Sequence, residues 1–258
     1  MKNKKLVVCL IIFACLVVLV VLSSAIFALS NVSVNFVYDS PSFEGKQQEI
    51  IDSADFAYGT NVLFLKKQPY ISRLEKNFPY LKVLNIETKF PNKLVINCEE
   101  RQEFFAVKLI DNTYAIIDED YKILKKTSSF VNTQNNAILL DGTAFSGANH
   151  EGEFLSIDSS QENLMLNVML SLREWDLSYT NLKQKIKKIT VNYEEENNVL
   201  VEMHSGVQIK LINAKDRCSD MLNLAFSMYD YTQKDYKSQG IIEVRIVNGS
   251  AKAFYRAS

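Results

Sequence analysis

The chain has 258 residues, a formal net charge of −1 and 23% charged residues. Its basic residues do not gather in one stretch, whereas a nucleic-acid-binding protein needs a clustered basic face. Eight glycines are few for this length, and no glycine-rich phosphate loop is present. We therefore expect no nucleic acid, no cofactor and no small-molecule substrate.

An uncharged apolar run occupies residues 6–29, and Lys2, Lys4 and Lys5 precede it. A helix of about 20 apolar residues spans a bilayer, and basic residues stay on the cytoplasmic side. The run predicts a cytoplasmic tail over residues 1–5, one transmembrane helix over residues 6–29 and an extracytoplasmic remainder. A cleaved signal peptide is the competing interpretation, although its apolar part is normally shorter.

Residues 31–101 alternate between strand-like and helix-like patterns. Expected elements are a strand over residues 32–38, helices over 47–54 and 69–78, and strands over 81–90 and 93–100. Pro69 suits the first turn of the second helix, and Pro91-Asn92 supplies a turn between the last two strands. This order predicts a small α+β unit, β-α-α-β-β, in which two helices cover one face of a sheet.

Residues 102–258 predict a larger, mixed α+β domain. Amphipathic helices are expected over residues 161–177 and 215–229. Strands are expected over residues 114–118, 122–125, 137–140, 186–193, 199–203, 207–212, 241–247 and 251–255. Asn248-Gly249 between the last two strands is a strong hairpin signal, so we expect a hairpin at the C-terminus.

No arrangement of residues indicates catalysis or metal binding. His150 and His204 have no second histidine at metal-ligand spacing, and the acidic runs at residues 118–120 and 194–196 fall at expected turns. Cys98 and Cys218 have the spacing of buried apolar residues, and a bridge between them stays open. We expect no catalytic, cofactor or metal residue, and interpret the chain as an interaction protein.

Several short motifs occur in an order that resembles one known family. They are GTNVLFL at residues 59–65, PY at 79–80, FPNKLVI at 90–96, EER at 99–101, YAIID at 114–118 and EVRIVNG at 243–249. Together they are similar to the FtsQ/DivIB family of bacterial cell-division proteins. By this resemblance residues 31–101 are an FtsQ-type POTRA domain and residues 102–258 are the second, β domain. Residues 127–160 do not align.

The resemblance implies a non-enzymatic scaffold of the division machinery that helps to recruit and regulate septal wall synthesis. It implies a single-pass protein of the cell membrane, located at the division septum. The implied partners are FtsB/DivIC-type and FtsL-type bitopic coiled-coil proteins, together with other septal membrane proteins. The POTRA surface around residues 71–86 is implied to contact some of them.

The partner in this family adds a strand to the C-terminal edge of the second domain, a mode in which main-chain groups give affinity and alternate side chains give specificity. The corresponding segment here is residues 243–254. The expected partner-binding residues are Glu243, Arg245, Ile246, Asn248 and Phe254. Ile246 and Phe254 are equally compatible with an ordinary core role. A membrane-anchored envelope enzyme and a POTRA-bearing transport or secretion component remain alternatives.

Overall fold

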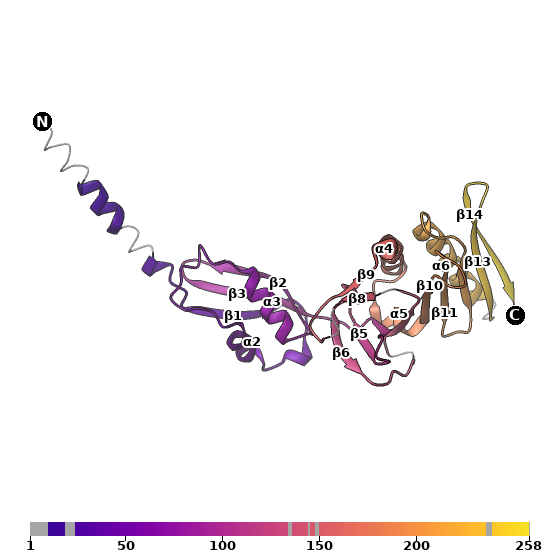
Figure 1. The fold of residues 1–258 in the computed structure, drawn as a ribbon, viewed down its shortest axis with the longest axis horizontal. Helices are drawn as coiled ribbons and strands as arrows, with labels where there is room; N and C mark the ends of the chain where they lie inside the picture. Colours follow the sequence, from indigo (N-terminus) through magenta and orange to yellow (C-terminus); the bar gives the residue numbers. More distant parts are fainter. Residues whose placement is uncertain are drawn as a thin grey trace, which may run out of the picture. The chain divides into compact units, whose positions relative to one another are not determined.

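The structure is a computed structural model that describes residues 10–18, 24–133, 136–143, 145–147, 150–235 and 239–257. The chain forms two compact units, one ending at Arg101 and the other beginning at Gln102, as Figure 1 shows. Each unit has its own cluster of buried hydrophobic side chains. Both units combine helices with a sheet, so the predicted α+β class is confirmed.

The predicted transmembrane helix over residues 6–29 is wrong. Helical backbone covers residues 10–18 and 24–26. Nine helical residues rise about 14 Å, roughly half of a hydrocarbon core. In the described part of the chain no helix has both the length and the apolar character needed to cross a membrane. Residues 6–9 and 19–23 of that prediction, and the predicted tail over residues 1–5, lie outside the described residues.

The first unit has a three-stranded sheet in the order β1-β3-β2. Strand β1 (Asn31–Phe36) runs parallel to β3 (Lys93–Glu100), and β2 (Leu81–Lys89) runs antiparallel to it. A short 3-10 helix (Pro41–Phe43), α2 (Gln47–Ala54) and α3 (Gln68–Asn77) complete the unit. Ile50 of α2 and Leu74 of α3 are fully buried in one hydrophobic cluster with Ile96 of β3, because apolar residues at helical spacing form one face.

The second unit is built on a nine-stranded sheet in the order β14-β13-β12-β11-β10-β7-β4-β5-β6. Its strands are β4 (Phe105–Lys108), β5 (Tyr114–Ile117), β6 (Ile123–Thr127), β7 (Ile138–Asp141), β10 (Ile186–Val191), β11 (Val199–Met203), β12 (Gln208–Leu211), β13 (Gly240–Val247) and β14 (Ser250–Ala257). The β10–β7, β4–β7 and β12–β13 pairs are parallel, and the other pairs are antiparallel.

Three helices accompany this sheet: α4 (Ser159–Trp175), α5 (Tyr179–Lys185) and α6 (Cys218–Asp235). A small separate ribbon pairs β8 (Phe145–Gly147) with β9 (Leu155–Ile157). Helix α6 packs against α4 and against β12, β13 and β14, and its buried stripe includes Leu222, Ala225 and Phe226. One face of the C-terminal end of the sheet is therefore covered by α6.

Candidate partner-binding edge

The last two strands form a regular hairpin at one edge of the nine-stranded sheet. Asn248 and Gly249, with φ of 51° and 76°, form its two-residue turn, and two successive positive φ values define a type I′ turn. Pairing runs without interruption from Val247↔Ser250 to Gly240↔Ala257. Strand β14 has β13 as its one strand neighbour in the described part of the chain, so its other side is an open edge.

The register determines which main-chain groups of β14 point out of the sheet. In a two-residue hairpin the pair beside the turn is hydrogen-bonded, and such pairs alternate with pairs that are not. The amide of Ile212 donates to the carbonyl of Val244 (3.0 Å), so Val244 directs its main-chain groups toward β12. Its partner Ala253 consequently directs its N–H and C=O away from β13. Ala251 and Tyr255 share this orientation.

The two faces of the hairpin differ in chemistry. Ala251, Ala253 and Tyr255 lie on the face that packs against the buried core. The opposite face has a shallow hollow lined by Ile241, Glu243, Arg245, Phe254 and Arg256. The edge therefore offers two alanines and a tyrosine on one face, and an aromatic ring among charged side chains on the other.

The polar groups of this open face contact one another. The guanidinium of Arg245 lies 4.9 Å from the centre of the Phe254 ring, a cation–π arrangement. The Arg245 Nε atom lies 3.8 Å from Glu243 Oε1. Both side chains are partly exposed, so this pair is weak. It leaves a charged, accessible surface beside the open edge.

The five residues predicted from sequence therefore fall into three places. Glu243, Arg245 and Phe254 lie together on the open face. Ile246 faces the other way, in β13, opposite Ala251. Asn248 lies in the turn, where its positive φ is a structural requirement. Whether any of the five contacts a partner stays a prediction.

Sequence reasoning missed the residues that present the open edge itself. Ala251, Ala253 and Tyr255 supply the outward main-chain groups, and Lys252 and Arg256 add positive charge to the open face. The Asn248-Gly249 turn could have identified these residues. A two-residue turn fixes the register of the hairpin, and the register determines which residues of β14 direct their main-chain groups outward. The surface predicted at residues 71–86 spans most of α3 and the first part of β2; whether it contacts a partner stays a prediction.

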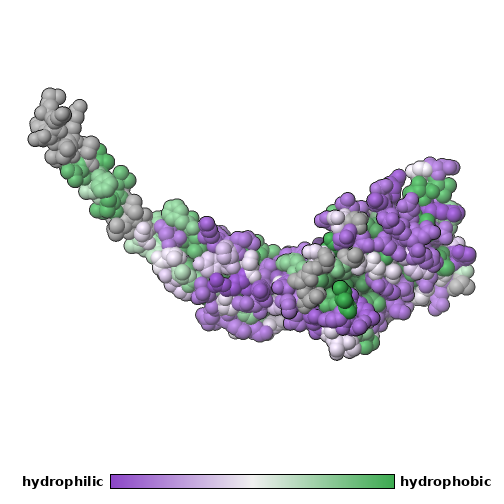
Figure 2. Space-filling view, in the orientation of Figure 1, coloured by the Kyte–Doolittle hydropathy of each residue, from purple (hydrophilic) through white to green (hydrophobic). Residues whose placement is uncertain are grey.

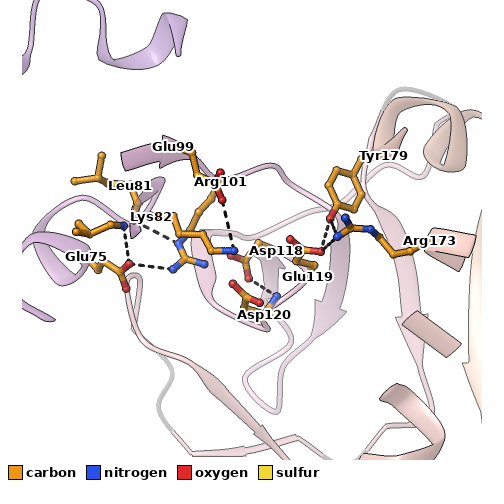
Figure 3. Close-up of polar contacts among 11 residues, drawn as sticks. Glu75, Leu81, Lys82, Glu99, Arg101, Asp118, Glu119, Asp120, Arg173 and Tyr179 are labelled. Atoms are coloured by element: carbon orange, nitrogen blue, oxygen red, sulfur yellow. Dashed lines mark hydrogen bonds and ion pairs between the residues drawn. The ribbon is translucent and has the colours of Figure 1, made fainter. Parts of the chain in front are cut away.

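Two polar clusters outside this edge connect structural elements, as Figure 3 shows. In the first unit Arg101 Nη2 lies 3.3 Å from Glu75 Oε1, and its Nε donates to the Leu81 carbonyl (3.3 Å). In the second unit Arg173 of α4 contacts Glu119 and the Tyr179 hydroxyl. Burial raises the pKa of Tyr179, and its hydrogen bond to Glu119 adds to this.

The described residues contain no group of three His, Cys, Asp or Glu side chains that could hold a metal ion. Cys98 and Cys218 are buried free thiols, so the disulfide that the sequence allowed does not join them. The chemistry that the C-terminal edge offers is recognition through main-chain hydrogen bonds and surface side chains.

Comparison with known proteins agrees with this architecture. Residues 45–101 match the FtsQ-type POTRA domain, so this part of the first unit is POTRA-like. The cell division protein DivIB of Clostridium botulinum strain Hall is 25% identical over 247 residues, covering 94% of this chain and 88% of that protein. The Clostridium tetani protein of the same name is 26% identical over 198 residues, covering 77% and 69%. These matches support the FtsQ/DivIB family and confirm the resemblance found in the sequence.

Proposed function

We propose that this cell-division protein is a non-enzymatic scaffold that binds other division proteins at the septum and helps to recruit and regulate septal wall synthesis. The DivIB relatives support the division role. The proposed partners are coiled-coil proteins of the FtsB/DivIC and FtsL types. The open edge of β14 is the observation that carries the proposal.

The geometry of β14 suits strand addition. An incoming strand forms hydrogen bonds with the outward N–H and C=O groups of Ala251, Ala253 and Tyr255, which lie at alternate positions of one extended strand. Addition of a strand to an exposed edge derives its affinity from such bonds and its specificity from alternate side chains. An open edge of eight residues presents unpaired main-chain groups that can pair with another chain, which supports a role in strand addition.

The side chains predicted from sequence receive distinct roles in this proposal. Phe254 provides an aromatic contact on the open face, and Arg245 and Glu243 steer the partner by charge. Ile246 extends the opposite face beside Ala251. Asn248 holds the turn and lies at the end of the edge, where it contacts the incoming strand.

Ala253→Pro tests the edge directly. Proline removes the outward N–H of residue 253 and places its ring where a partner strand would pair, while the bonds between β13 and β14 remain. We expect affinity for the purified FtsB/DivIC-type partner of the same organism to fall at least tenfold, about 1.4 kcal/mol. Titration calorimetry measures this loss.

Ala253→Ser is the matched control, because it keeps the N–H and the small side chain. It should bind as the wild-type chain does, and both variants should keep the wild-type circular dichroism spectrum. In dividing cells a fluorescent fusion of the wild-type chain should form a midcell band. Wild-type affinity in a folded Ala253→Pro variant contradicts the edge proposal, and a uniform envelope signal contradicts the septal role.

A further inference from the structure

Exposed apolar side chains gather at one end of the first unit. Phe64 is 82% exposed and Phe90 77% exposed, and Tyr58 and Leu63 are each more than half exposed. We call these four residues the apolar tip. Side chains this open project from the surface, and do not form the walls of a groove.

Main-chain hydrogen bonds bring the segments of the apolar tip together. The amide of Val62 donates to the Phe27 carbonyl (2.9 Å), and the amide of Ser30 donates to the Asn92 carbonyl (3.0 Å). The rings of Phe27 and Phe90 meet edge to face, with centroids 5.3 Å apart. The loop over residues 58–65 and the turn between β2 and β3 therefore lie beside the chain that enters β1.

Three lysines adjoin the segments of the apolar tip in the sequence. Lys66 follows the loop directly, and Lys89 and Lys93 flank the turn that carries Phe90; all three are exposed. Lys89 pairs with Glu87 (2.7 Å), and this hydrogen bond lowers the pKa of the Glu87 carboxyl. Phenylalanine and leucine side chains together with lysines are typical of segments that lie in the headgroup interface of a bilayer.

The segment that leads into this end is also apolar and exposed. In residues 10–18 and 24–26 every large apolar side chain, from Leu10 to Ile26, is at least 46% exposed. Figure 2 shows the hydrophobic colour on this segment and on the adjoining part of the first unit. Exposed apolar side chains in such number mark an interaction site.

We propose that the apolar tip inserts into the interface of a lipid bilayer that contains anionic headgroups. The rings of Phe64 and Phe90 enter the boundary between headgroups and acyl chains, and the lysines contact anionic lipids, as in other interfacial anchors. Convex loop tips fit a deformable lipid surface, whereas a protein partner needs a complementary wall. The proposal is independent of partner binding at β14.

Quenching by brominated lipid tests which end of the unit touches the bilayer. The full chain is mixed with vesicles of brominated phosphatidylcholine and phosphatidylglycerol, and Phe64→Trp is compared with Tyr38→Trp. Tyr38 is 68% exposed and follows the far end of β1, about 20 Å along the strand. Emission from Trp175, present in each variant, is subtracted as the wild-type signal.

We expect the tryptophan at position 64 to lose about half of its emission, because an interfacial group lies 5–10 Å deep. The tryptophan at position 38 should keep its emission. Phe90→Trp should behave as Phe64→Trp does, and vesicles without phosphatidylglycerol should weaken the quenching. Equal quenching at positions 64 and 38, or none at position 64, overturns the proposal.

Discussion

Arg101 shows how one residue acquires a physical role that its motif does not reveal. Its side chain is 3% exposed, and Glu75 Oε1 lies 3.3 Å from its guanidinium. The same carboxylate oxygen accepts the amide of Val83 (2.9 Å). Arg101 thus joins the end of the first unit's chain to α3 and β2. From the sequence alone, Arg101 is the last residue of the EER motif at residues 99–101, and the motif does not reveal these contacts.

The two buried cysteines give a prediction at the same scale. Burial raises the pKa of the Cys98 thiol to about 12, and that of Cys218 to about 12. A thiol alkylates through its thiolate, so neither should react with iodoacetamide at pH 8 while the protein is folded. Both should react after unfolding in urea, and mass spectrometry of the cysteine peptides measures the difference.

The same shifts predict how stability depends on pH. The folded pKa of Cys98 lies above the value of about 8.5 in an unfolded chain, so folding favours the protonated thiol. Its contribution to stability is complete below the unfolded pKa and is lost as pH rises toward 12. Cys98→Ala should remove this part of the alkaline decline. Rapid alkylation of folded wild-type protein at pH 8 contradicts the burial on which both expectations depend.

At the scale of elements, local patterns predicted most strands and helices but not their order in the sheet. The alternation in β13 and the Asn248-Gly249 turn were sufficient for the C-terminal hairpin. Strand β4 was missed because Phe105, Ala106 and Val107 are all buried, which gives no alternation. Its parallel pairing with β7 joins distant segments, and local sequence does not encode such contacts.

Helix α5 was missed for a different reason. Its seven residues carry a single buried apolar side chain, Leu182, so the helical period is absent. Its N-cap, Ser178, accepts a hydrogen bond from the Asn181 amide (3.3 Å), and such a cap was the available signal.

The predicted binding residues also show a limit of local sequence patterns. The pairing of β13 with β14 places Glu243, Arg245 and Phe254 on one face, and the strand order shows that β14 lies at the edge; neither can be derived from local sequence.

The alternation along β14 predicts that proline lowers the unfolding free energy at one position and leaves it unchanged at the next. Lys252 pairs with Arg245 in a hydrogen-bonded pair, so Lys252→Pro removes a bond within the sheet. We expect a loss of about 1–3 kcal/mol in unfolding free energy, together with faster amide exchange in β13. Ala253→Pro should show neither change. Equal destabilisation by the two prolines would mean that the register or the open edge is assigned wrongly.

At the scale of the whole molecule, two separate cores predict two separable unfolding transitions. Leu74 is fully buried in the first unit and Leu222 in the second. Substitution of either by alanine should cost about 2–5 kcal/mol in its own unit. The consequences should stay within that unit, since each core is made of its own residues.

The single tryptophan of the chain makes this prediction measurable. Trp175 stacks on Phe226 of α6, with ring centroids 4.2 Å apart, so its fluorescence reports unfolding of the second unit. Leu222→Ala should lower the urea midpoint of that signal by about 1–2 M. Leu74→Ala should leave the tryptophan midpoint unchanged, while circular dichroism should show helix being lost at a lower urea concentration than in the wild-type chain. If Leu74→Ala moves the tryptophan midpoint as far as Leu222→Ala does, the two units unfold as one cooperative body. A partner bound at β14 would then stabilise the first unit as well.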